Sequence, residues 1–154
     1  SSAASDVYKR QAKKIISVRK VEATKQISKK LHVLLGQEVY EYILLRKIDD
    51  VPCFLETTYL DSERYPDFEK YYTDKTSMGR ILKNVYHRKQ ISGEEHISVT
   101  YASEQEAALL EIIPDSPLFF TSGVVKDEEG VIIMYYKQLI RGDKFKLVSR
   151  IESE

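Results

Sequence analysis

Two charged side chains, Arg46 and Glu56, could do binding chemistry, and Glu56 lies in an otherwise apolar stretch, Cys53-Phe54-Leu55-Glu56. An arginine guanidinium offers a planar fork of donors that suits a carboxylate or a phosphate. A carboxylate is costly to bury without a partner, so Glu56 must face solvent, an arginine or a ligand hydroxyl. The two side chains are candidates for a polar binding site, and the alternative is that Arg46 is a surface residue paired with Asp49 or Asp50.

Whether Arg46 and Glu56 share a face of a sheet depends on the turn between their strands. A tight two-residue loop at Asp49 and Asp50 would place Glu56 on the side of Ile43 and Arg46 on the other side. An odd-length loop or a bulge would bring both to one face, and bulges are common beside functional sites. A shared site therefore requires such an irregularity.

A second group of candidates begins a predicted helix at Ser77-Met78-Gly79-Arg80. The Ser77 hydroxyl and the free backbone N–H groups of the first turn could hold an anion, with Arg80 adding positive charge. The alternative is that Ser77 is a simple N-cap, and the two roles are compatible. We include Ser77, Met78 and Arg80 among the candidate ligand-binding residues.

Two further candidates lie on predicted strands. His96, Ser98 and Thr100 alternate on one face, which could be a polar pocket wall or a solvated sheet face. Tyr135 and Tyr136 must point to opposite faces, so at most one of them can line a pocket. Ser98 and Tyr136 complete the candidate set.

The sequence gives no sign of catalysis or metal binding. Its three histidines are far apart, and no nucleophile elbow, phosphate loop or paired-histidine motif is present. Cys53, the only cysteine, lies in an apolar strand and reads as a small core residue. We predict no catalytic residues, no metal and no cofactor.

Length and charge narrow the class of protein further. A chain of 154 residues suits a single domain, and 24 basic against 24 acidic residues leave no net field to hold a polyanion such as DNA. No apolar run approaches the roughly 20 residues that a membrane span needs. We expect a soluble cytoplasmic domain over residues 15–154, preceded at 1–14 by a tag remnant, linker or arm.

Periodicity predicts an α+β fold with a mostly antiparallel sheet and helices packed on one of its faces. A first hairpin surrounds residues 47–52, and a second covers 118–145 with its turn at 127–130. The predicted strands are 15–23, the two arms of each hairpin (the first from 38 to 60), 94–101 and a last strand at 146–151. The predicted helices are 24–33, 65–72, 77–86 and 103–112. A Ser103–Glu106 capping box opens the last of these helices.

The two hairpins, the capping-box helix between them and the Arg141-Gly142-Asp143 turn resemble the UTRA domain, the effector-binding half of HutC-type GntR transcription regulators. The resemblance runs from about Ile15 to Ile151. It implies a chorismate-lyase-like fold that binds a small-molecule effector, such as a sugar phosphate or another metabolite, and forms a homodimer. It also implies that operator DNA is bound only through an N-terminal winged helix-turn-helix domain, which is absent from this chain.

Within that resemblance, Arg46, Glu56 and Ser77 match positions that line the pocket of relatives sensing sugar phosphates. Three departures from the pattern make a less polar effector plausible: Leu44 stands where those relatives carry a second Arg, and this chain lacks their acid near Met134 and their Tyr near Ile140. Two other function classes stay open. One is a chorismate-lyase-like enzyme acting on a small aromatic or sugar acid, and the other is a dimerisation module without a ligand; we predict that the domain is not an enzyme.

Overall fold

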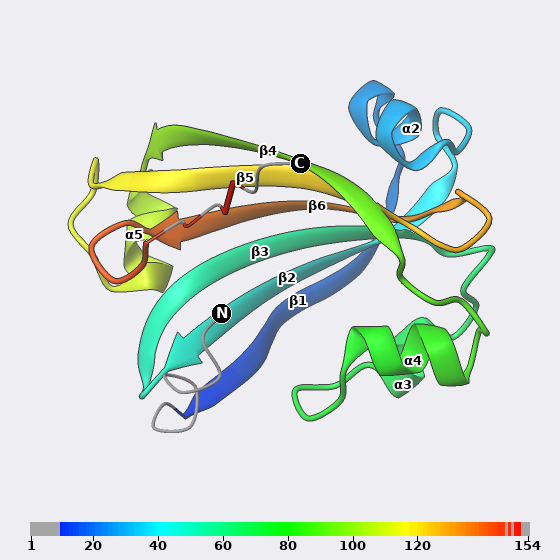
Figure 1. Ribbon diagram of the computed structural model, residues 1–154, viewed down its shortest axis with the longest axis horizontal. Helices are drawn as coiled ribbons and strands as arrows, with labels where there is room; N and C mark the ends of the chain where they lie inside the picture. The colour runs from blue at the N-terminus through cyan, green and yellow to red at the C-terminus, as the bar shows by residue number, and fades with distance from the viewer. Residues whose placement is uncertain (1–9, 147, 149, 152–154) are drawn as a thin grey trace.

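The computed structural model describes residues 10–146, 148 and 150–151. Its central feature is a six-stranded antiparallel sheet with the strand order β1-β2-β3-β6-β5-β4 (Figure 1). The strands are β1 (Gln11–Glu22), β2 (Glu38–Ile48), β3 (Val51–Asp61), β4 (Ser92–Tyr101), β5 (Pro117–Lys126) and β6 (Ile132–Arg141). The helices are α2 (Lys25–Leu31), α3 (Phe68–Tyr71), α4 (Met78–Asn84) and α5 (Glu104–Leu110). The predicted α+β class and antiparallel sheet are confirmed.

The helices cover both faces of the sheet, so the expectation that they lie on one face is wrong. Helices α2 and α5 bury the face that carries Val39 and Leu45, at opposite ends of the sheet in Figure 1. Helices α3 and α4 bury the other face, where Tyr40, Tyr42 and Leu44 lie. The cause lies in β2, whose neighbouring residues are buried on both sides and therefore need cover on both sides.

Two boundaries differ from the sequence-based expectation. Strand β1 begins at Gln11, four residues before the predicted start. The predicted last strand is wrong for the residues described there, because Lys146, Val148, Arg150 and Ile151 are not in a strand. Strand β6 lies between β3 and β5, so a strand that continued from it would find both adjacent places in the sheet already taken.

The shorter elements follow local rules. The Ser103 hydroxyl accepts a hydrogen bond from the Glu106 N–H, and the Glu106 carboxylate accepts one from the Ser103 N–H, which confirms the predicted capping box.

Among the helices of the described residues, none is long and apolar enough to cross a bilayer.

A buried ion pair fixes the turn between β5 and β6. The carboxylate of Asp127 accepts hydrogen bonds from the backbone N–H groups of Glu129 (2.9 Å) and Val131 (3.0 Å), and Arg88 donates to it from 3.1 Å. Although burial favours the neutral acid, the two N–H groups and the Arg88 charge hold the pKa of Asp127 below its ordinary value. The hydrogen bonds and the ion pair that close this turn therefore depend on the ionised form of Asp127.

Replacing Asp127 with asparagine should lower the free energy of unfolding by about 1–3 kcal/mol, because a buried charged acceptor is lost. A depressed folded-state pKa contributes stability above the unfolded value, near 3.9 for aspartate, and that contribution is lost as the pH falls through the folded value. Urea unfolding should therefore show a gap between wild type and Asp127→Asn that is constant at neutral pH and closes below about pH 4. Glu129→Gln is the control, since the Glu129 side chain is 75% exposed and 3.6 Å from Arg88; an equal loss in that variant would contradict the prediction.

Candidate functional site

A β-bulge brings Arg46 and Glu56 to the same face of the sheet. Asp49 and Asp50 form a tight turn with positive φ angles of 50° and 65°, so the loop itself is the two-residue one. Next to the turn, however, the register shifts: Lys47 pairs with Pro52, but Arg46 pairs with Phe54. Cys53 is the extra residue of the bulge. The irregularity that a shared site requires is present.

The two side chains form a partly buried ion pair. The Arg46 Nε donates to Glu56 Oε1 over 2.8 Å, and the two side chains are 43% and 16% exposed. Burial alone would lower the pKa of Arg46, but the hydrogen bond and the charge of Glu56 raise it above its ordinary value. The alternative pairing of Arg46 with Asp49 or Asp50 is wrong, since both aspartates bond to Arg10 instead.

Two uncharged side chains extend this pair across the sheet. Gln138, directly opposite Glu56 in the register, donates its Nε2 to the same carboxylate oxygen over 2.6 Å. Its Oε1 accepts from the Thr121 hydroxyl at 3.4 Å. The result is a polar row that crosses β2, β3, β6 and β5 on the face covered by α3 and α4. Sequence reasoning missed Gln138 and Thr121 because only the strand register places them beside Glu56.

A second cation, Lys13, lies beside Arg46 on β1. Its ammonium group donates to the Thr76 carbonyl and lies 3.9 Å from the centre of the Tyr72 ring. Burial lowers the pKa of Lys13, and the charge of Arg46 lowers it further; burial raises the pKa of Tyr72 to about 12. Lys13 had been assigned to the N-terminal arm, so sequence reasoning missed it as well.

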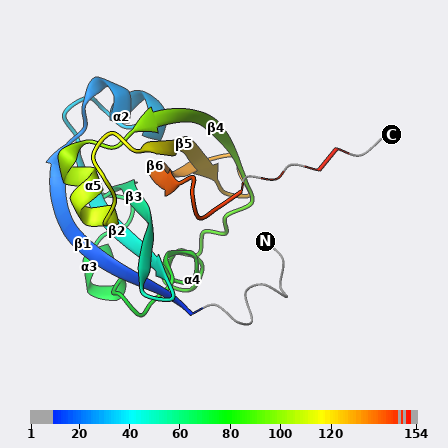
Figure 2. The same cartoon turned by 90° about the vertical axis from the view of Figure 1, so that its left-hand side faces the viewer.

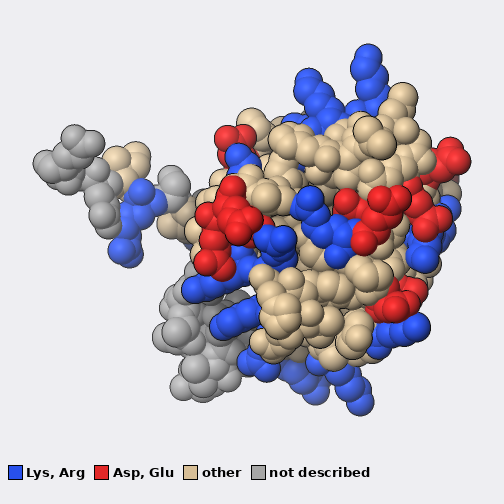
Figure 3. Space-filling model, turned by 90° about the vertical axis from the view of Figure 1, so that its right-hand side faces the viewer, with Lys and Arg blue, Asp and Glu red and all other residues tan. Residues whose placement is uncertain are grey.

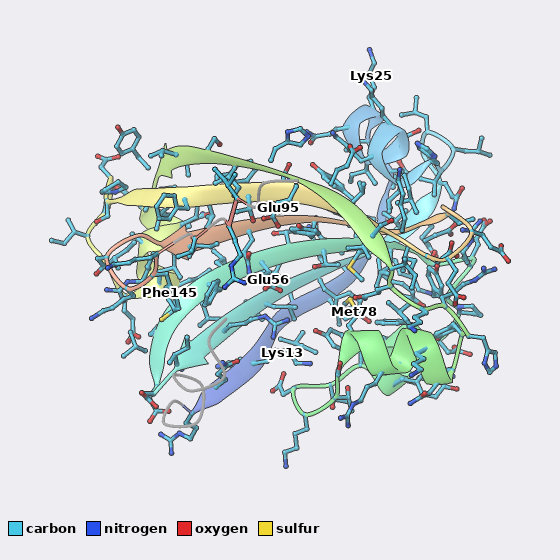
Figure 4. The ribbon with its side chains drawn as sticks, viewed as in Figure 1. Lys13, Lys25, Glu56, Met78, Glu95 and Phe145 are labelled. Carbon is cyan, nitrogen blue, oxygen red and sulfur yellow. The ribbon has the colours of Figure 1, made fainter. Side chains whose placement is uncertain are left out.

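The start of α4 borders this polar row. Ser77 is the N-cap, and its hydroxyl accepts from the Arg80 N–H at 3.4 Å. Met78 points from α4 toward the sheet (Figure 4) and packs against its core. Arg80 is exposed. The loop before Ser77 is tied to β1, because the Ile15 N–H donates to Asp74 over 2.7 Å in addition to the Lys13 bond. These contacts hold the helix start close to Lys13.

A hollow of about 410 Å³ adjoins the row at β4, lined by residues 90–95, Val124, Val125 and Tyr136. The Tyr136 hydroxyl donates to the Glu95 carboxylate, so the ring lies across Gly123, which has no side chain to obstruct it. Burial raises the pKa of Tyr136 well above its ordinary value, and the bond to Glu95 adds to the shift. Tyr136 lies two residues from Gln138 on the same face, so the hollow and the polar row are neighbours.

The structure does not bring every candidate residue to this place. Ser98 pairs with Phe120 and points to the sheet face opposite Glu56, together with His96 and Thr100. Arg46, Glu56 and Tyr136 share one face, Ser77 and Met78 begin the helix above it, and Arg80 faces solvent.

The charges of the site are mixed in sign. Lys13 and Arg46 are offset by Glu56, Asp74 and Glu95. Basic and acidic side chains are also interspersed over the end of the molecule that carries α2, α3 and α4 (Figure 3). Among the residues that the structure describes, no group of three or more His, Cys, Asp or Glu side chains is arranged to hold a metal ion. The arrangement can donate to acidic oxygens and accept from hydroxyl or ammonium groups of one ligand.

Comparison with known proteins decides the family. The model of the UTRA domain matches residues 8–146. The chain belongs to the UTRA domain family. UTRA is the ligand-binding domain of GntR-family transcriptional regulators, and the relatives are named as regulators, so the enzyme alternative is not favoured.

Two curated relatives illustrate the match. The probable fructoselysine utilization operon transcriptional repressor of Escherichia coli K12 is 22% identical over 134 residues, which cover 87% of this chain and 55% of the repressor. The uncharacterized regulator YurK of Bacillus subtilis is 27% identical over 99 residues, which cover 64% of this chain and 41% of YurK. The chain therefore spans about half the length of the curated relatives it matches.

Solved structures show the same fold. The effector domain of PhnF from Mycobacterium smegmatis superposes with a TM-score of 0.90 at 22% identity, over 98% of this chain and 93% of that one. The C-terminal domain of YurK gives a TM-score of 0.81 at 23% identity, over 84% and 90% of the two chains. A ligand-binding domain of a GntR-family regulator from Bordetella bronchiseptica gives 0.86 at 15% identity, over 93% and 91%.

Proposed function

We propose that this UTRA domain senses a small polar metabolite, which binds between the sheet and the start of α4. The observation that carries the proposal is the Arg46–Glu56–Gln138 network, held half-buried by the β-bulge on the face beneath α3 and α4. Two ionic groups kept partly out of water on a sheet face do little for stability, which favours a role in binding.

The effector that suits this site carries an acidic group together with hydroxyl or ammonium groups. Arg46 and Lys13 would receive the acidic group, with the Ser77 end of α4 nearby. Glu56, Gln138 and the Tyr136–Glu95 pair would receive the donors. A sugar phosphate meets this description, and so does a sugar joined to an amino acid, the chemistry named for the operon of one relative.

In the whole protein we propose that the effector changes operator affinity through an N-terminal winged helix-turn-helix domain of a cytoplasmic homodimer. Such coupling requires the effector to bind two arrangements of the domain with different affinity, because equal affinity shifts no equilibrium. The loop between α3 and α4 is the element best placed to respond, since its contacts to β1 run through Lys13 and Asp74 beside the site.

Thermal unfolding of the domain with sugar phosphates, amino-acid derivatives, phosphonates and fatty acids tests the proposal. A ligand at 100 times its Kd adds about 2.7 kcal/mol to the folded state, so a genuine effector raises Tm clearly. The rise should be lost in Arg46→Ala and Glu56→Gln.

Arg19→Ala is the matched control, because Arg19 forms a comparable ion pair with Glu41 (2.6 Å) on the opposite face of the sheet. It should respond to the effector as the wild type does. A ligand whose stabilisation survives both site substitutions would refute the assignment of the site.

A further inference from the structure

The charges of the ligand site are divided between its two ends. Lys13 lies on β1 and Glu95 lies on β4, the two outer strands of the curled sheet (Figure 2). Arg46 is opposite Lys13 in the register, and Glu56 lies further across on β3. Figure 4 shows Lys13, Glu56 and Glu95 in this order across the sheet. The site therefore has a cationic end at β1 and β2 and an acidic end at β4.

The acidic end has no cation of its own. In the part of the chain that the structure describes, Glu95 forms no ion pair, whereas Glu56 is paired with Arg46 at 2.8 Å. The hydrogen-bond partner of the Glu95 side chain is the Tyr136 hydroxyl, which donates its only proton to the carboxylate. The carboxylate and the phenol oxygen thus offer acceptors, and one uncompensated negative charge, to a ligand.

The hollow beside Glu95 reaches the same helix start as the cationic end. Gln90 lines this space of about 410 Å³, and a Cβ placed on Gly79 of α4 would lie 3.9 Å from the Gln90 side-chain amide. The loop that leads into α4 is in turn held by Lys13, which donates to the Thr76 carbonyl. A single ligand beside the start of α4 can therefore meet both ends of the site.

We propose that the effector carries an acidic group, held by Lys13 and Arg46, and at its other end an ammonium group, held by Glu95. This inference rests on the proposed function and specifies the chemistry of the second end. An ammonium group has three donors, no acceptor and a positive charge, which match the acceptors and the charge at Glu95. A ligand hydroxyl would leave that charge uncompensated. Glu95 is thus the residue that distinguishes an amine-bearing effector from a plain sugar phosphate.

The distance between the two ends sets the length of the effector. Strands β3 and β4 are three places apart in the sheet, which is about 14 Å at the usual spacing of about 4.8 Å. The acidic group and the ammonium nitrogen should therefore lie roughly 10–15 Å apart. A hexose phosphate alone is shorter than this, so the ammonium group belongs on a flexible chain attached to the sugar.

Isothermal titration calorimetry with a matched pair of ligands tests the proposal. One ligand is the aminohexyl glycoside of a hexose phosphate, and the other is the hexyl glycoside, which lacks the terminal charge. The wild-type domain should bind the amine about tenfold more tightly, the effect of one hydrogen bond to a charged group. Glu95→Gln can still accept from Tyr136 but has no charge, so it should bring the two affinities to within about twofold of each other.

Glu94→Gln is the matched control, because it removes the same charge from the next residue of β4, whose side chain lies on the other face of the sheet. It should keep the preference of the wild type. A preference that survives Glu95→Gln, or equal binding of the two ligands by the wild type, overturns the ammonium site. In that case a loss of both affinities in Arg46→Ala would still support the proposed function; if neither ligand binds the wild type, both proposals fail.

The length of the linking chain gives a second test. The aminoethyl glycoside of the same hexose phosphate places its nitrogen several ångströms short of Glu95, so its advantage over the ethyl glycoside should be less than about twofold. An advantage as large as that of the aminohexyl ligand would contradict the position of the ammonium group at β4.

Discussion

Replacing Phe68 with alanine should lower the free energy of unfolding by about 3–5 kcal/mol, the cost of removing a fully buried aromatic ring. Phe68 has no exposed surface and lies at the centre of the cluster that attaches α3 to the sheet. Its ring centre is 5.7–6.3 Å from four others, those of Tyr40, Tyr42, Tyr72 and Tyr86. The surrounding rings come from different elements and cannot all close the cavity at once, so urea unfolding should show the full loss.

The control for this variant is Tyr71→Ala in the same helix. Tyr71 is 45% exposed, and one ring, Tyr86, lies 6.3 Å from it. Its removal should change stability by well under the loss at Phe68, near the roughly 0.5 kcal/mol typical of surface positions. Equal losses in the two variants would mean that helix propensity, and not the buried ring, holds α3.

The same cluster supports the proposed ligand site, so the Phe68 variant should have a second effect. Relative to the wild type, backbone hydrogen exchange in the variant should accelerate more in α3 and α4 than in the central strands, because these helices would lose their attachment before the sheet unfolds. An effector that needs the start of α4 would then bind more weakly to the folded variant. Uniform exchange over the whole domain would contradict this reading.

Much of the fold could be predicted from local patterns. Alternation and apolar runs located the strands from β2 to β6, and the spacing of Ser103 and Glu106 located the start of α5. Interactions between residues close together in the chain determine these features, so a single sequence is enough to predict them. Helix ends were placed less well: α3 covers only Phe68–Tyr71, because tertiary contacts of its rings, and not helix propensity, determine its extent.

The site was predicted only in part, because it depends on register. Glu56 was recognised as unusual in an apolar strand and Arg46 mostly through the family resemblance, but their meeting depended on the bulge at Cys53. A signal for that bulge was present: Pro52 has no backbone N–H, and a proline in a central strand is found at bulges or at the start of the strand. Gln138 gave no comparable signal, since its place opposite Glu56 follows from the pairing of β3 with β6.

The second prediction with a large effect concerns Gly123, where β5 passes beneath the Tyr136 ring. A Cβ at this position would overlap the backbone carbonyl oxygen of Glu94 and stand 2.8 Å from the Tyr136 hydroxyl. A flexible side chain could move away, but the carbonyl moves only if β4 moves. Gly123→Ala should therefore cost about 3 kcal/mol, the upper end of the usual range for overpacking, measured by urea unfolding.

Two comparisons separate the causes of that loss. Gly142→Ala is the matched control, because its added Cβ would meet the Phe119 ring at 3.4 Å, an ordinary contact, and should change stability by about 0.5 kcal/mol or less. Adding Tyr136→Phe to Gly123→Ala removes the hydroxyl overlap and leaves the carbonyl overlap, so it should restore only a minor part of the loss. Full restoration would show that the Tyr136 ring alone requires glycine at position 123 and that the Glu94 carbonyl does not.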